Sequence, residues 1–235
     1  MDLGRQRVNE LLADATERLD ASGSESARLD AEVLLAHVLG IDRSGLVAHP
    51  EAVLSTSQQE TYASSIERRE AGEPVAYIRG MKEFYGNAIS VDPRVLIPRP
   101  ETETLVELAL ARITRDLTGS PRDKSDPYLV WDVGTGSGAI PVAIASELRR
   151  RRYGDAVHFL VSDISGDARD VATLNVVSHG LAHLFTFAEG DLIDVAPAPP
   201  YPVDLLLANL PYIPAGMVPD LPVAASFEPV GALDG

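Results

Sequence analysis

The chain has no cysteine among its 235 residues. This absence excludes disulfide bonds, thiolate metal sites and a cysteine nucleophile, and it suits a reducing compartment. The sequence also lacks any run of about eighteen apolar residues, and residues 1–20 contain no apolar stretch of signal-peptide length. We therefore expect a soluble, cytoplasmic protein without a membrane span.

Basic residues are scarce. Twenty lysines and arginines stand against thirty-five aspartates and glutamates, which gives a formal net charge of −15. A nucleic-acid partner normally requires a clustered basic face, because neutralised phosphates supply most of the affinity. The composition therefore favours a basic protein or a cationic small molecule as partner. The four-arginine run Arg149–Arg152 is interpreted as cations that oppose a helix dipole.

The first part of the chain has helical periodicity. Apolar residues recur at three-four spacing in residues 8–19 and again in residues 34–39, where Gly40 is a plausible helix stop. The segment Ser57–Glu60 has the capping-box pattern and predicts the start of a third helix. Two strand-like runs around Gly86-Asn87 then predict a hairpin. We expect a helical domain over 1–76, a hairpin linker over 77–100 and a third domain over 101–235.

That third part alternates between strands and helices. The runs "YLVWDVG", "VHFLVSDI", "FTFAEGD" and "VDLLLAN" predict four strands, and amphipathic segments separate the first three. Such alternation indicates an α/β fold with a parallel sheet and right-handed crossovers.

A glycine-rich segment, "DVGTGSG" (Asp132–Gly138), joins the first of these strands to a helix. Gly134, Gly136 and Gly138 allow a tight turn, a close approach of ligand to backbone, and close helix–strand packing. With Ala139 the segment also satisfies the dinucleotide-binding pattern. By itself it indicates a nucleotide-type ligand without excluding a turn that merely needs glycine.

Suitable side chains also end the other strands. Asp163 ends the second strand, where its carboxylate can accept hydrogen bonds from two ribose hydroxyls, and Asp191 ends the third, within reach of an adenine amine. Ligands of α/β proteins bind at the carboxyl ends of parallel strands. Each aspartate alone is more often a strand-end cap, but together with the glycine segment they predict a nucleotide site.

The fourth strand ends at Asn209, in the segment "ANLPYIP". The Asn209 side-chain oxygen and the Leu210 carbonyl can accept both hydrogens of a planar NH₂ group, while Pro211 restricts the backbone and Tyr212 offers a face for stacking. This arrangement would orient an amide or amine nitrogen for attack. The alternative is an Asx-type turn that only reverses the chain.

His179 and His183 have a spacing found in metal sites. Gly180 stands where a zinc peptidase would have glutamate, and no third ligand is evident, so we expect no metal site.

Taken in order, "DVGTGSG", "SD" and "NLPY" resemble class I S-adenosylmethionine-dependent methyltransferases that methylate amino groups. The stretches "RREAGEPVAYIRGMKEFYG" and "LIPRPETETLVE" more specifically resemble the HemK/PrmC family, and the likeness continues to "FEPVGALDG". Enzymes of this family methylate the side-chain amide of the glutamine in the GGQ motif of class I peptide-chain release factors. The resemblance implies an N-terminal helical bundle followed by a Rossmann-like class I methyltransferase domain.

The resemblance also implies roles for individual residues. The methionine part of S-adenosylmethionine would lie on the glycine loop, the ribose on Asp163, and the adenine beside Asp191 and Leu192. The target glutamine would be held by the Asn-Leu-Pro-Tyr segment, with Asn209 as the catalytic residue and a neighbour of the cofactor as well. The loop Ile97–Thr102 would close over the cofactor pocket. The glycine-loop residues concerned are Gly134, Thr135, Gly136, Ser137 and Gly138, and the substrate-binding residues are Asn209, Leu210, Pro211 and Tyr212.

Two departures from the family pattern keep alternatives open. The family has Asn-Pro-Pro-Tyr where this chain has Leu210, and Asn-Leu-Pro-Tyr is also typical of ribosomal RNA adenine dimethyltransferases. The family fold has seven sheet strands, whereas four are predicted here, so we expect a C-terminally truncated chain. The alternatives are an adenine amino-methyltransferase acting on RNA or DNA, and an inactive truncated cofactor-binding module. The favoured hypothesis is a monomeric release factor methyltransferase without a direct nucleic-acid partner.

Overall fold

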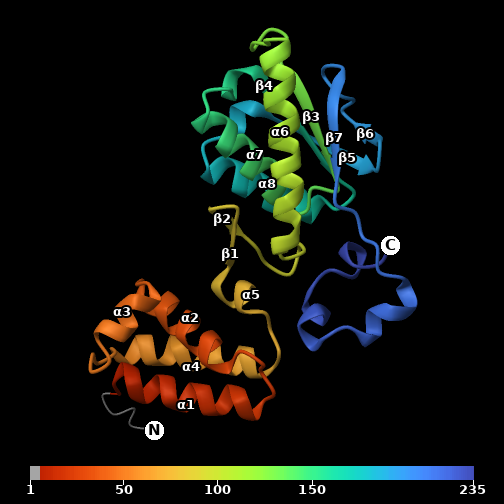
Figure 1. The fold of residues 1–235 in the computed structure, drawn as a ribbon. Coiled ribbons are helices and arrows are strands. Elements are labelled where there is room, and N and C mark those ends of the chain that lie inside the picture. The colour runs from red at the N-terminus through yellow and green to blue at the C-terminus, as the bar shows by residue number, and fades with distance from the viewer. Residues whose placement is uncertain (1–5) are drawn as a thin grey trace. The chain divides into compact units, whose positions relative to one another are not determined.

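The computed structural model describes residues 6–235 (Figure 1). Its contacts divide the chain into two compact units. One contains the residues up to Gly80 together with Pro222–Phe227, and the other contains Met81–Leu221 together with Glu228–Gly235. The three-part division expected from the sequence stays a prediction. No helix among the described residues combines the length and apolarity needed to cross a membrane.

The first unit is built from helices, as the periodicity predicts. Their apolar faces form one core, in which the residues predicted for the first helical face are all buried, and Leu34 and Leu35 are fully buried on the second helix. Gly40 ends that helix in the left-handed conformation with φ +66°. The helices are α1 (Val8–Ala21), α2 (Ala27–Leu39), α3 (Arg43–Ala48), α4 (Thr56–Glu70) and α5 (Val75–Arg79).

The capping box of α4 lies two residues earlier than the sequence pattern indicates. Ser55, not Ser57, is the N-cap, because its backbone is extended and its side chain accepts a hydrogen bond from the Gln58 N–H. The Gln58 side chain returns the contact by accepting from the Ser55 N–H. Both Ser55 and Ser57 are followed by residues that could complete a capping box. The helix starts after Ser55, because Ser55 and Gln58 form both reciprocal hydrogen bonds.

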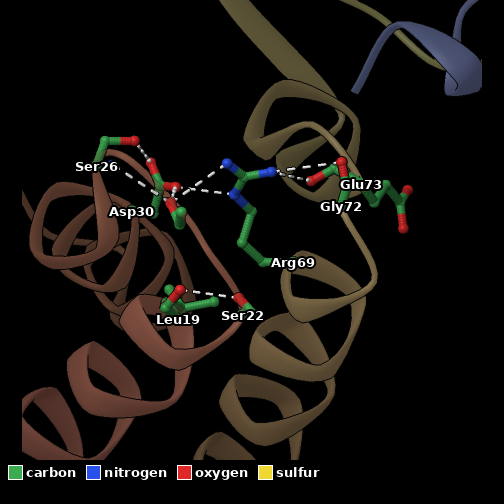
Figure 2. A network of polar contacts seen from close by, with 8 residues as sticks. Leu19, Ser22, Ser26, Asp30, Arg69, Gly72 and Glu73 are labelled. Carbon is green, nitrogen blue, oxygen red and sulfur yellow. Dashed lines mark hydrogen bonds and ion pairs between the residues drawn. The ribbon is translucent and has the colours of Figure 1, made fainter. Parts of the chain in front are cut away.

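A nearly buried aspartate joins α2 to α4 (Figure 2). The Asp30 carboxylate accepts hydrogen bonds from the hydroxyls of Ser24 and Ser26 and from Arg69 Nε at 2.8 Å. Arg69 also donates to backbone carbonyls just beyond the end of α4, including that of Gly72. Removing water from a carboxylate is costly, and these donors offset that cost. The network therefore fixes the C-terminal end of α4 against α2.

The second unit consists of a hairpin followed by an α/β domain. Its elements are β1 (Met81–Phe84), β2 (Asn87–Ser90), α6 (Glu103–Gly119), β3 (Tyr128–Val133), α7 (Ala139–Arg150), β4 (Val157–Asp163), α8 (Gly166–Ser178), β5 (Phe185–Asp191), β6 (Asp194–Ala196) and β7 (Val203–Ala208). Short 3₁₀ turns follow at Ala215–Asp220, Val223–Phe227 and Val230–Ala232, of which the second belongs to the helical unit. Helix α6 packs beside α7, and α7 and α8 both contact β4 (Figure 1). The α/β fold class with an N-terminal helical region is confirmed.

The turn of the hairpin is shifted by one residue from its predicted place. Its central residues are Tyr85 and Gly86, both with positive φ, whereas Gly86-Asn87 is the pair that the sequence indicates. Two-residue hairpin turns of the type that matches strand twist need positive φ at both central positions. Asn87 instead opens β2 and donates its side-chain N–H to the Tyr85 carbonyl at 2.9 Å, which helps to hold Tyr85 in this conformation.

The sheet has the order β6-β5-β4-β3-β7. The four predicted strands are present and run parallel, with β3 between β4 and β7. The fifth strand, β6, runs antiparallel to β5 and was not expected; it has three residues, too few for a periodic signal. The expected truncation stays a prediction.

Strand β3 is buried along its whole length. All six of its residues are buried, and Trp131 donates its ring N–H to the Ser162 hydroxyl of β4 at 2.9 Å. Because β3, β4, β5 and β7 are parallel, their carboxyl ends lie at one edge of the sheet. That edge gathers the glycine segment after β3 with the residues that end β4, β5 and β7.

Candidate active site at the carboxyl edge of the sheet

A cavity of about 510 Å³ lies at this edge, entirely within the second unit. Its volume falls in the range of small-molecule and cofactor pockets. Ten of the residues predicted from the sequence line it: Gly134, Thr135, Gly136, Ser137, Asp163, Asp191, Leu192, Asn209, Leu210 and Pro211. Gly138 and Tyr212 do not line this cavity.

Gly138 has a packing role instead. It is the N-cap of α7 with φ +75°, and a Cβ there would lie 3.1 Å from the Cβ of Ala172 and 3.3 Å from its Cα. Glycine at this position therefore lets α7 begin close against α8. Gly134 faces the cavity, where an added Cβ would lie 2.9 Å from the Leu210 side chain. The glycine loop after β3 and the segment after β7 are thus close neighbours across the cavity.

Asp163 holds the glycine loop in place. Its Oδ2 accepts a hydrogen bond from the Gly136 N–H, and its Oδ1 accepts one from the Ser165 N–H, both at 2.9 Å. Ser165 is the N-cap of α8. Since an ionised carboxylate offers about four acceptor sites, Asp163 retains capacity for two donors from a ligand.

A buried acidic residue, Asp132, lies beneath the loop. It is 1% exposed; its Oδ2 accepts a hydrogen bond from the Thr135 hydroxyl at 2.7 Å, and its Oδ1 has no partner within the described residues. Burial raises the pKa of Asp132 to about 7; the negative charge of Asp163 adds to the rise, and the Thr135 bond opposes it. In the sequence, Asp132 is only the first residue of the glycine motif. The sequence alone does not show whether an aspartate at this position is buried or caps the end of the strand.

Asp132 is expected to make the stability of the second unit depend on pH. Its carboxyl titrates near pH 4 in the unfolded chain and near pH 7 in the folded one, so the folded state binds the extra proton between these values. The free energy of unfolding should therefore fall as pH rises from about 4 to about 7, by up to about 1.4 kcal/mol per pH unit from this group. Denaturant titrations of the native protein and of Asp132→Asn at several pH values measure how the slope of unfolding free energy against pH differs between them.

The matched control for that experiment is Asp170→Asn, which changes an exposed aspartate on α8. The unfolding free energy of this variant should depend on pH with the same slope as that of the native protein. Equal slopes for the native protein and Asp132→Asn would show that the buried carboxyl does not titrate in this range.

The Asn-Leu-Pro-Tyr segment lies between two cavities. Asn209 and Leu210 line the first cavity and also a second one of about 350 Å³, to which Tyr212 contributes an 84% exposed ring. An Asx turn at Asn209 would need a backbone N–H two residues later, and that residue is Pro211, which has none. Pro211 therefore cannot donate the bond that defines such a turn, and Asn209 lines both cavities.

Two further segments form walls of the first cavity. From the predicted loop, Pro98, Arg99 and Thr102 line it. Pro229, Gly231 and Ala232 also line it, and only the overall likeness of "FEPVGALDG" pointed to this segment beforehand.

The remaining candidate features have local explanations. His179 Nδ1 lies 2.8 Å from the Asn175 carbonyl, and the described residues contain no group of three or more side chains suited to hold a metal ion. The arginine run ends α7, where Arg150 and Arg151 both pair with Glu147.

The mostly parallel sheet, the glycine loop after β3 and the acidic ends of β4 and β5 together define a Rossmann-like α/β fold with a nucleotide-type site. Residues 10–80 match the model of the PrmC N-terminal domain family. Over 97% of its length the chain is 39% identical to the release factor glutamine methyltransferase of Moorella thermoacetica, of which the match covers 75%. The corresponding enzyme of Rhodopirellula baltica is 40% identical over 96% of this chain and 73% of its own length. That of Chlorobaculum tepidum is 42% identical over 81% of this chain and 62% of its own length. The chain belongs to the release factor glutamine methyltransferase family.

Proposed function

We propose that the protein transfers a methyl group from S-adenosylmethionine to the side-chain amide nitrogen of the glutamine in the GGQ motif of peptide-chain release factors. The observation that carries this proposal is the position of Asn209 and Leu210, which line both cavities. One cavity can then hold the cofactor and the other can admit the substrate side chain, with the amide acceptors between them.

The first cavity fits the cofactor by the chemistry of its walls. The loop Gly134–Ser137 would hold the methionine part through backbone groups, and Asp163 has free acceptor sites for the ribose hydroxyls. Asp191 and Leu192, at the end of β5, would lie beside the adenine. Gly138 would contribute only through the packing of α7 on α8.

When bound, S-adenosylmethionine supplies an electrophilic methyl group on a sulfonium centre. The Asn209 Oδ1 and the Leu210 carbonyl would accept the two N–H bonds of the glutamine amide and so fix the direction of its nitrogen. These acceptors would favour the cationic nitrogen that forms as the methyl group leaves the sulfonium sulfur. The extra proton can then be lost to water after the transfer, so no general base has to act first. Pro211 limits backbone movement, and Tyr212 offers an exposed face in the second cavity for stacking against the peptide.

The partner would be a release factor whose exposed GGQ loop enters the second cavity, with additional contacts to the helical unit. The net charge of −15 supports a protein substrate over RNA, since RNA affinity depends on neutralised phosphates. We further propose that the protein acts as a monomer in the cytoplasm, without direct contact to nucleic acid.

The test is methyl transfer from labelled S-adenosylmethionine, with purified release factor and ribosomal RNA offered side by side and mass spectrometry used to locate the label. The expected result is label on the GGQ glutamine and none on a release factor in which alanine replaces that glutamine. Label on adenine would contradict the proposal. Cofactor binding without transfer to either substrate would also contradict it and would favour a binding module.

A further inference from the structure

Residues 228–235, which we name the strap, connect two walls of the active site within the second unit. At one end, Glu228 Oε2 accepts a hydrogen bond from Arg99 Nη2 at 2.5 Å, and its Oε1 accepts one from the Ile97 N–H at 3.4 Å. At the other end, the Ile213 N–H donates to the Leu233 carbonyl, and the Gly235 N–H donates to the Ile213 carbonyl. The strap therefore joins the Ile97–Thr102 loop to the segment that follows β7.

Both attachment points lie at the cavities. Arg99 lines the first and the second cavity, and Ile213 lines the second directly after Tyr212. The strap itself supplies Ala232 to both cavities. A shift of the strap would consequently change the walls of the cofactor site and of the substrate site together.

The attachment at Glu228 joins a buried carboxylate to a partly exposed arginine. The Glu228 side chain is 2% exposed, whereas its partner Arg99 is 44% exposed and faces the cavities. Burial raises the pKa of the Glu228 carboxyl, and Arg99 and the Ile97 N–H act against that rise. A buried carboxylate is a poor way to gain stability compared with an apolar side chain of similar size. The position of Glu228 is better explained by its contacts with Arg99 and Ile97.

We propose that Glu228 is a positioning residue for methyl transfer, and that through Arg99 and Ile97 it fixes the wall shared by the cofactor and substrate cavities. This inference rests on the proposed function for its substrate part only. Glu228 contacts no reacting atom, so its loss should weaken binding on both sides of the wall more than it slows the transfer step.

The test compares Glu228→Gln with the native protein. The Kd for S-adenosylmethionine, measured by calorimetry, and the KM for release factor are each expected to rise about tenfold, the effect of losing one charge-assisted hydrogen bond, while kcat falls less than about threefold. Arg99→Gln should give similar changes, and the double variant should be no worse than either single variant, because all three lose the same contact. Kd and KM values within twofold of the native ones would overturn the proposal.

The matched control is Asp204→Asn. Asp204 also accepts from an arginine, Arg122 at 3.1 Å, and from a backbone N–H, that of Leu129 at 2.9 Å, but it lines neither cavity. The Asp204→Asn substitution should leave Kd and KM unchanged even if it lowers the melting temperature. An equal rise of Kd in Asp204→Asn would assign the Glu228 effect to general stability and overturn the positioning role. Because Kd is measured without turnover, it still tests Glu228 if release factor proves not to be the substrate.

Discussion

Asn209→Ala is expected to lower kcat by about two to three orders of magnitude, which is the usual effect of removing one group that stabilises charge in a transition state. The affinity for S-adenosylmethionine should stay within a few-fold of the native value. Asn209 lines both cavities, and its side-chain oxygen is one of two proposed acceptors for the glutamine N–H bonds. Without it the amide nitrogen can rotate away from the methyl group. Single-turnover rates with release factor, together with calorimetry of cofactor binding, separate the two effects.

The control for this experiment is Leu210→Ala. The second proposed acceptor is the main-chain carbonyl of residue 210, which any side chain supplies, and the Leu210 side chain is 36% exposed. Turnover of this variant should remain within a few-fold of the native value. Native turnover in Asn209→Ala, or an equally large loss in Leu210→Ala, would assign the chemistry to another group.

Asp163→Ala is expected to raise the Kd for S-adenosylmethionine about a hundredfold. The carboxylate accepts the Gly136 and Ser165 N–H bonds and offers acceptor sites for the ribose, so its removal both loosens the glycine loop and removes ligand contacts. Two hydrogen bonds to a charged group account for about 3 kcal/mol, which is about a hundredfold in affinity. Calorimetric titration measures this value, and Asp163→Asn, which keeps one acceptor oxygen, should have an intermediate Kd.

Asp194→Ala removes an exposed carboxylate on β6 that does not line the cavity, and this variant should bind the cofactor with native affinity. Circular dichroism and melting temperature must show that Asp163→Ala is folded before its Kd is compared. A Kd within threefold of the native value would rule out the proposed ribose contact.

Features with a local cause could be predicted from the sequence. The four parallel strands follow from short apolar runs bounded by turn residues, and the glycine loop follows from the need for positive φ between β3 and α7. Their parallel order then places Asp163, Asp191 and Asn209 at one edge. Some predicted positions were shifted by one or two residues in the structure, because backbone angles set them. At the hairpin turn, for example, the two adjacent residues with positive φ are Tyr85 and Gly86.

Features that depend on distant partners could not be predicted. Arg99 and Glu228 are 129 residues apart, and a glutamate in a proline-containing segment is normally exposed, so nothing local indicates that this one is buried. The same holds for Asp132, whose unpaired Oδ1 is evident only once the loop is placed above it. Tyr212 belongs to the same short motif as Asn209, yet it lines only the second cavity, a difference that the motif does not indicate.

The only tryptophan of the chain is placed where cofactor binding can be followed optically. The Trp131 indole is 5% exposed and donates to the Ser162 hydroxyl, and Ser162 lines the first cavity next to Asp163. Indole emission responds to the polarity and charge around the ring, so a sulfonium-bearing ligand that reaches Asp163 acts on the chromophore through one intervening hydroxyl. We expect ligand binding in this cavity to change the Trp131 emission, so that affinities of the native chain and its variants can be titrated without a label.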